Sequence, residues 1–399
     1  MKTGTRIELW NFGQINEGII EIGDLTVLVG EQASGKTLFL ELFKFTYDRH
    51  FIRKIFQEKG FTIDSSHDLL SLYFGCSKEL IPIKHDSAIK VNGKLIDLYN
   101  FKGRVKSDQK KKESVFYIPA QRILTLSDGW FKDFNAFSLE TPFVVRHFSE
   151  TLRISTERII RSQSKEPILF PHPKRLISEL KYKLQQTIFK GWNLIYKTEG
   201  FRKHLVLTHP KSQDTSLSLF SWSTGQREFV PLLLGLYWLI PSAKKSKRDF
   251  DYVVIEEPEM GVHPHAYLDI ILLMLTLLDR GYKILISSHS PAILDTIWVL
   301  RNLFRLKNTS IQIKLFMQFF GLKKRHNWIY NLIRSLKKKD MRVFYFKTSS
   351  DYQTTIHDIS ALENFEEESI QNWGGLLSIA DKASEVVSTI SRLSMSRLK

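Results

Sequence analysis

Short apolar runs and longer, helically spaced apolar segments alternate along the chain. The run at 19–29 is interrupted by a Gly-Asp turn, and a glycine-rich loop and a helix start at 38–45 follow it. Further along, strand-like runs at 252–255 and 283–286 flank a helical segment at 266–278. Because a strand, helix, strand order pairs the two strands in parallel, this pattern predicts an α/β fold with parallel strands.

The remaining patterns predict additions to this sheet. Asn92-Gly93 predicts a hairpin turn inside a stretch, 64–104, that we otherwise expect to be irregular. The other predicted elements are strands at 115–118 and 194–208, helices at 176–188 and 376–393, a basic helical segment at 297–336, and a hairpin formed by 343–346 and 353–359.

These elements predict three regions. The first is a core at 1–300, with an insertion at about 51–113 and a helical lobe at about 125–190. A basic helical segment at 301–340 follows it. The last region, 341–399, contributes a hairpin and a helix that complete the core.

Composition narrows the functional classes. Lys and Arg number 58 against 42 Asp and Glu, a formal charge of +16, which favours polyanionic partners such as DNA or an acidic protein surface. Cys76 is the only cysteine, which fits a reducing cytoplasm. The first residues lack the apolar region of a signal peptide. The longest apolar stretches, 229–241 and 267–278, are shorter than the roughly 20 residues of a bilayer span, so we expect no membrane segment.

Residues 30–37 read Gly-Glu-Gln-Ala-Ser-Gly-Lys-Thr and match the phosphate-loop pattern G-x-x-x-x-G-K-[ST] between a strand and a helix. In such a loop, backbone N–H groups and the helix N-terminus face phosphates. Lys36 can reach the β- and γ-phosphates, and the Thr37 hydroxyl can bind Mg²⁺. We therefore predict ATP and Mg²⁺ as cofactors, with the nucleotide bound by Gly30, Gln32, Ser34, Gly35, Lys36 and Thr37. An incidental glycine turn with a surface lysine is the alternative.

Two adjacent acids follow the strand at 252–255. The carboxyl end of a strand is where nucleotides bind in open α/β sheets. Glu256 is the candidate Mg²⁺ ligand, and Glu257 is the candidate that polarises the attacking water. An acidic turn that merely ends a strand is the alternative.

Further motifs resemble those of ABC-type ATPases. The run Ser-Thr-Gly-Gln-Arg-Glu at 223–228 resembles the ABC signature, which implies that Ser223, Gly225 and Gln226 contact a nucleotide held by a second subunit. An ordinary serine N-cap is the alternative. His289 resembles the switch histidine, and residues 260–264 resemble the D-loop. Gln121, in Ile-Pro-Ala-Gln-Arg, resembles the Q-loop glutamine, which senses Mg²⁺ and water; a buried turn with a structural arginine is the alternative.

The runs at 117–122 and 257–264 resemble the SMC, RecF and OLD branch of ABC ATPases. The stand-alone ATPases of bacterial anti-phage systems, such as that of PARIS, are the most similar in style, and residues 372–376 add to this resemblance. It implies an ABC-type P-loop ATPase head with a mixed β-sheet core, a helical lobe, and a C-terminal helical insertion plus hairpin. It also implies a homodimer or higher homo-oligomer with ATP between paired heads.

Such a protein acts as a switch, and we expect a cytoplasmic ATPase that senses phage infection and controls an effector, a nuclease or toxin encoded nearby. A RecF- or SMC-type ATPase acting directly on DNA in repair or chromosome maintenance is the first alternative. The nucleotide-binding subunit of a transporter is the second.

The basic segment at 301–339 holds two clusters, Lys323 to Arg325 and Lys337 to Lys339, among aromatic residues. Aromatic rings between cations suit nucleic acid, because bases stack on rings while cations neutralise phosphates. The segment could equally dock an acidic protein. In the remaining interpretation, the aromatics Phe316, Phe319, Phe320, Trp328 and Tyr330 are core and the lysines form a solvated face.

Overall fold

The structure is a computed structural model of the 399-residue chain. It describes residues 4–99, 112–161, 167–172, 175–240, 247–323 and 327–361. The predicted helix at 376–393, the run at 372–376, and Lys324 and Arg325 of the first basic cluster lie outside these residues.

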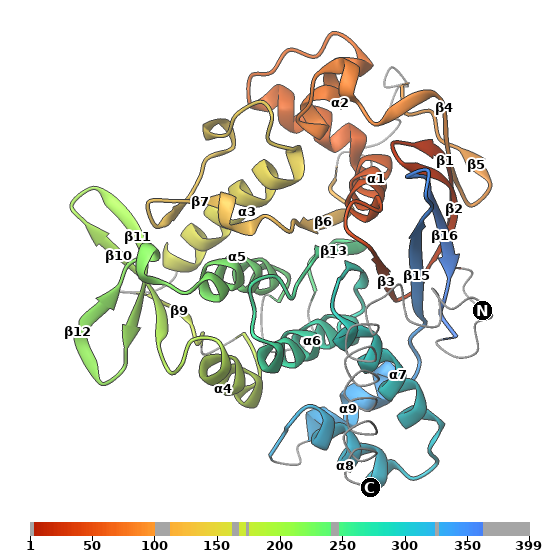
Figure 1. The fold of residues 1–399 in the computed structure, drawn as a ribbon. Coiled ribbons are helices and arrows are strands. Elements are labelled where there is room, and N and C mark those ends of the chain that lie inside the picture. Colours follow the sequence, from red (N-terminus) through yellow and green to blue (C-terminus); the bar gives the residue numbers. More distant parts are fainter. Residues whose placement is uncertain are drawn as a thin grey trace, which may run out of the picture.

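Ten strands of the described residues form one mixed sheet in the order β5-β4-β1-β2-β16-β15-β3-β14-β13-β6 (Figure 1). The five strands from β15 to β6 pair in parallel, and the hairpins β1–β2, β4–β5 and β15–β16 add antiparallel strands. The bounds are β1 (Thr5–Phe12), β2 (Ile15–Ile22), β3 (Leu25–Gly30), β4 (Ile83–Val91), β5 (Lys94–Leu95), β6 (Val115–Ile118), β13 (Tyr252–Glu256), β14 (Lys283–Ser287), β15 (Met341–Thr348) and β16 (Thr354–Asp358). The predicted mixed-sheet α/β architecture is confirmed, including the hairpin formed by β15 and β16.

Side chains of the central strands alternate between two hydrophobic cores. In β3, Val27 and Val29 enter one core and Leu28 enters the other; in β13, Val253 and Val254 are divided in the same way. The first core contains α5 (Thr224–Leu239), α6 (Pro264–Asp279) and α7 (Pro291–Arg305), and the second contains α1 (Lys36–Glu58) and α2 (Ser66–Phe74). Helices on both faces bury the parallel strands, whose apolar sequences require this cover.

A smaller antiparallel sheet, in the order β12-β11-β10-β9, lies away from the large one (Figure 1). Its strands are β9 (Ile168–Phe170), β10 (Asn193–Glu199), β11 (Arg202–His209) and β12 (Ser212–Leu217). The predicted helical lobe corresponds to α3 (Phe143–Arg161) and α4 (Ser178–Thr187), but β9 also falls within it. A short hairpin of β7 (Leu126–Ser127) and β8 (Trp130–Phe131) precedes α3.

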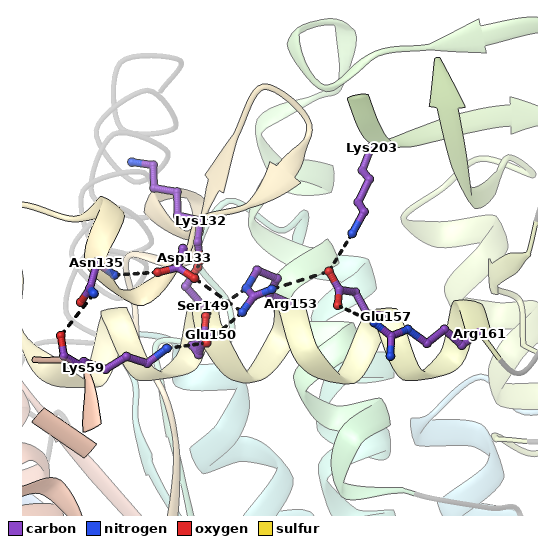
Figure 2. A network of polar contacts seen from close by, with 10 residues as sticks. All are labelled: Lys59, Lys132, Asp133, Asn135, Ser149, Glu150, Arg153, Glu157, Arg161 and Lys203. Atoms are coloured by element: carbon purple, nitrogen blue, oxygen red, sulfur yellow. Dashed lines mark hydrogen bonds and ion pairs between the residues drawn. The ribbon is translucent and has the colours of Figure 1, made fainter. Parts of the chain in front are cut away.

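An ion-pair network runs along α3 and connects it to the end of α1 and to β11 (Figure 2). Arg153 pairs with Glu150 at 2.9 Å and with Glu157 at 3.6 Å on the same helix. Lys59, which follows α1, pairs with Glu150 at 2.7 Å, and Lys203 of β11 pairs with Glu157 at 2.8 Å. The small sheet is therefore joined through α3 to the helix that begins at the phosphate loop.

The segment at 297–336 forms parts of three helices: α7, α8 (Thr309–Phe319) and α9 (Asn327–Leu336). Phe316 and Phe320 are buried in the first core, which supports the interpretation of these two aromatics as core residues. Tyr330 is 44% exposed. The predicted boundaries at about 51 and at 300 fall inside α1 and α7, and the division into three regions stays a prediction.

The stretch at 64–104 is more regular than expected, because it contains α2. Ser65 caps this helix: its hydroxyl accepts from the Asp68 N–H at 3.2 Å, and the Asp68 carboxylate accepts from the Ser65 N–H at 2.7 Å. Gly75 ends the helix with a φ of 64°. The predicted Asn92-Gly93 turn is confirmed, with φ of 50° and 77° between β4 and β5.

Candidate functional site

The loop from Gly30 to Gly35 connects the carboxyl end of β3 to the first turn of α1. Gly30 has a φ of 146°, and a Cβ there would lie 2.5 Å from the carbonyl oxygen of Phe346. Gly35 has a φ of 91°, and a Cβ there would lie 2.8 Å from Ile15. Both positions therefore require glycine, because L side chains rarely adopt these φ values and no space remains for a Cβ.

The Lys36 ammonium lies over this loop. Its Nζ donates to the carbonyl oxygens of Gly30 at 3.0 Å and Glu31 at 2.6 Å, and to the Ser34 hydroxyl at 3.0 Å. Burial lowers the pKa of Lys36 to about 8, against the opposing attraction of nearby carboxylates. A phosphate group in the loop would offer this ammonium stronger, charged acceptors. Gln32 is exposed on the same loop.

Glu256, at the end of β13, has the environment of a cation ligand. It is 3% exposed; its Oε2 accepts from the Ala120 N–H at 3.1 Å, whereas its Oε1 is buried with no hydrogen-bond partner among the described residues. Burial raises the pKa of this carboxyl, and the nearby Thr37 hydroxyl acts in the opposite direction. An orphaned buried carboxylate oxygen beside a hydroxyl fits Mg²⁺, which takes oxygen ligands.

Glu257 is held in a strained conformation beside His289. Its φ is 40°, which is uncommon for a residue with a side chain, and its N–H donates to the Ser287 carbonyl of β14 at 2.9 Å. The His289 Nε2 lies 3.4 Å from the Glu257 Oε1. Hydrogen bonding from His289 lowers the pKa of Glu257, and the charges of Lys36 and Arg122 act in the same direction. The carboxylate is therefore an oriented anion at neutral pH.

Arg122 holds the backbone of both acids, Glu256 and Glu257, a role that the sequence motif did not assign. Its fully buried guanidinium donates to the carbonyl oxygens of Glu256 at 2.7 Å and Glu257 at 3.0 Å. It also donates to the Glu228 carbonyl of α5 at 3.3 Å. Gln121, the residue that the motif indicated, is exposed, and its side chain makes no hydrogen bond within the described part of the chain. The structural-arginine interpretation therefore holds for Arg122, and a catalytic role of Gln121 stays a prediction.

Glu259 is a second residue that the motif did not assign. Its Oε1 accepts from the Ser288 hydroxyl at 2.8 Å and from the His289 N–H at 2.6 Å. It thereby fixes the loop that carries His289. Its position in the run Glu-Glu-Pro-Glu, three residues after β13 ends, was the available signal, because loops at the carboxyl ends of neighbouring parallel strands lie at the same edge of the sheet.

The signature-like residues lie at the start of α5. The Ser223 hydroxyl accepts from the Gln226 N–H at 3.2 Å, and the Gln226 side chain accepts from the Ser223 N–H at 3.0 Å, so the serine is a helix N-cap. Ser223 remains exposed. A Cβ on Gly225 would lie 2.6 Å from the carbonyl oxygen of Gly261, in the D-loop-like turn. No described contact joins these residues to the phosphate loop of the same chain.

The described site thus brings the residues of the phosphate loop together with the two acids and His289, at the carboxyl edge of β3, β13 and β14. A glycine loop at a helix start, a lysine above it and an oriented carboxylate define a P-loop nucleotide-binding domain.

The chain belongs to the family of AAA domains described as "AAA domain, putative AbiEii toxin, Type IV TA system", whose model matches residues 25–295. No curated protein matches the sequence. Among solved structures, the chain is similar to the SMC head domain from Thermotoga maritima, with 12% identity over 90% of this chain and 99% of that one, and a TM-score of 0.37. It is also similar to an SMC head bound to the C-winged helix domain of ScpA, with 8% identity over 92% of this chain and 98% of that one, and a TM-score of 0.41.

Within the described part of the chain, no helix combines the length and hydrophobicity that a bilayer span requires.

Proposed function

We propose that this AAA-family protein is an ABC-type ATPase that binds ATP and Mg²⁺ and hydrolyses ATP between two paired copies of itself. The observation that carries this proposal is the meeting of Lys36, Glu256 and the Glu257–His289 pair at one edge of the sheet. These groups match the needs of phosphoryl transfer to water, in which positioning and charge stabilisation supply most of the rate.

Each group has a separate task in this proposal. The loop N–H groups and Lys36 bind the β- and γ-phosphates, while Thr37 and the free Oε1 of Glu256 would hold Mg²⁺, which supplies positive charge to the phosphates. Glu257 accepts a proton from the attacking water. His289 orients Glu257 from 3.4 Å, and in this proposal its imidazole also lies beside the γ-phosphate.

The need for a second copy rests on the start of α5. Ser223 is exposed, and Gly225 packs against the D-loop-like turn of its own chain. Ser223, Gly225 and Gln226 together offer a hydroxyl and a helix N-terminus, groups that suit an anion such as the γ-phosphate of a nucleotide on a partner copy. A two-fold pair of heads would complete both sites at once.

The mass of the protein particle in solution, which distinguishes one copy from a pair, tests this proposal when measured with ATP and Mg²⁺. Glu257→Gln keeps the size of the side chain but removes its charge, so turnover should fall at least about 100-fold while ATP traps a pair of heads. The control Glu257→Gln/Ser223→Arg should bind ATP equally well and remain single, because the arginine crowds the contact. A Glu257→Gln protein that stays monomeric in ATP, or that retains wild-type turnover, contradicts the proposal.

The proposed biological role is a cytoplasmic switch in bacterial antiviral defence, which senses phage infection and controls a toxic or nuclease effector encoded nearby. The family description, which names a putative toxin of a toxin–antitoxin system, supports a role beside a toxic activity. Co-purification from the native operon with the Glu257→Gln variant tests it. Recovery of a neighbouring gene product whose binding depends on ATP is expected, and purification of the chain alone under every nucleotide condition contradicts it.

A further inference from the structure

We propose that the outer face of α9, with the residues just after it, binds single-stranded nucleic acid. The site is a hollow of about 600 Å³ lined by Asn331, Arg334, Ser335, Lys338 and Lys339, which we call the α9 hollow. It is separate from the proposed ATPase site.

The sequence of α9 places apolar residues on one face of the helix and polar or basic residues on the other. Ile329, Leu332, Ile333 and Leu336 are buried against the core at helical spacing. The opposite face presents Asn331 and Arg334, and Ser335 and Lys338 extend it along the same side. Every residue that lines the α9 hollow carries a hydrogen-bond donor, and none is acidic. The complementary ligand is rich in acceptors and negatively charged.

The positive charge of the α9 hollow is only partly compensated. Lys339 pairs with Asp24 at 3.1 Å, and the same carboxylate accepts from the Asp340 N–H at 3.0 Å. Arg334 and Lys338 are exposed and form no ion pair within the described part of the chain. Cations beyond a helix C-terminus also offset the partial charge of its carbonyls, so a merely solvated basic helix end is the competing interpretation.

An exposed ring next to these cations distinguishes nucleic acid from an acidic protein. Tyr330 is 44% exposed and precedes Arg334 by four residues, so the two side chains lie on the same helix face. Unpaired bases stack on such a ring while adjacent cations neutralise their phosphates. An acidic peptide offers nothing that needs the ring, and the bases of a duplex are already stacked on one another.

The α9 hollow lies at the opposite edge of the sheet from the phosphate loop. Asp24, which holds Lys339, immediately precedes β3, and the phosphate loop follows the other end of the same strand. Six residues of strand place the two edges about 17 Å apart. Nucleic acid and nucleotide therefore occupy different edges and do not compete.

Fluorescence anisotropy of a labelled oligothymidylate of about 15 nucleotides, titrated with the full chain without nucleotide at several salt concentrations, tests the proposal. Each phosphate contact contributes about 0.7 to the log–log salt slope for single strands. Loss of two contacts in Arg334→Glu/Lys338→Glu should reduce the slope by about 1.4, which corresponds to about 25-fold weaker binding at 0.1 M salt. The matched control Lys84→Glu/Lys94→Glu, on β4 and β5, should change neither value.

Variants of Tyr330 test the class of ligand. Tyr330→Ala should weaken binding about 5- to 150-fold, whereas Tyr330→Phe, which keeps the ring, should bind as the wild type does. Equal losses from both charge-reversal pairs, or no loss from either, show only a solvated basic surface and overturn the proposal. Competition by poly-glutamate as strong as by oligothymidylate, with Tyr330→Ala neutral, overturns nucleic acid as the ligand. All these side chains are exposed, so unchanged melting temperatures are the check on folding.

Discussion

Replacement of Arg122 by methionine should lower the melting temperature only modestly but reduce ATP turnover strongly. The guanidinium is fully buried and donates to four carbonyl oxygens, those of Glu256 at 2.7 Å, Glu257 at 3.0 Å, Pro119 at 3.1 Å and Glu228 at 3.3 Å. A hydrogen bond from a charged donor contributes about 1.5–3 kcal/mol. The four bonds do not add fully, because burial of the arginine itself carries a large desolvation cost.

The loss in free energy of unfolding follows from the carbonyl groups that Arg122→Met leaves without a donor. Loss of one partner of a buried charged network costs about 3–5 kcal/mol. For 399 residues that unfold together, an entropy of about 2.1 cal/mol/K per residue converts this cost into a fall in Tm of about 4–6 °C. Catalysis should suffer more, because Glu257 loses the donor that holds its strained backbone at a φ of 40°. A displacement of about 1 Å at a reacting group costs about 100-fold in rate.

Arg146 provides the matched control. It is equally buried and donates to the carbonyl oxygens of Thr141 at 2.8 Å and Ser138 at 2.7 Å, but it lies on α3 and contacts neither acid. Arg146→Met should also lower Tm, by a smaller amount because it leaves two acceptors instead of four, and should leave kcat per folded molecule unchanged. ATP turnover and Tm are measured on both variants at a temperature where both are folded. Equal kcat values for Arg122→Met and the wild type, or an equal loss in Arg146→Met, would refute the reasoning.

Three further predictions concern single contacts. The pKa of Lys36 near 8 should rise when phosphates bind, so calorimetry in buffers of different ionisation enthalpy should detect uptake of about 0.8 proton per ATP at pH 8.5, almost none at pH 6.5, and none at either pH in Lys36→Arg. Gly225→Ala places a Cβ 2.6 Å from the Gly261 carbonyl oxygen and should weaken ATP-dependent association, measured as the mass of the particle in solution. Binding of ATP to one head should stay as strong as in the wild type. Lys44→Met removes the buried ammonium that pairs with Asp48 at 3.0 Å and with the partly buried Glu113 at 2.8 Å. It leaves the buried Asp48 without its cation and should cost about 3–5 kcal/mol, measured as a lower urea midpoint at an unchanged m-value.

Features that are contiguous in sequence were predictable, and contacts between distant segments were not. The phosphate loop is one run of eight residues, and β13 ends directly in its two acids, so pattern and spacing located both. Arg122 lies beside the residue that the motif indicated, but its four acceptors come from three segments that only the folded chain brings together. The resemblance to a Q-loop therefore identified the region but did not indicate the part that Arg122 plays in it, and the role of Gln121 stays a prediction.

The region around α2 illustrates a different limit. Its helix signals, Ser65 with Asp68 and a terminal Gly75, are present in the sequence, but the nearby turn residues outweighed them. Aromatic residues in the basic segment were ambiguous for a physical reason: a ring serves equally well in a core or on a binding surface. Burial separates them, since Phe316 is 1% exposed and Tyr330 is 44% exposed.

Two contacts connect the start of α5 with the proposed catalytic acids. Arg122 donates both to the carbonyl oxygen of Glu228, in the second turn of α5, and to the carbonyl oxygen of Glu257. The backbone of Gly225 abuts that of Gly261, in the turn that follows the same acids. A partner copy that contacts the exposed end of α5 would therefore shift the Arg122 guanidinium that holds the Glu257 backbone, because close-packed interiors transmit small displacements. In a single head the acids are already ordered, so the proposed pairing would act by adjusting the position of a carboxylate that is already in place.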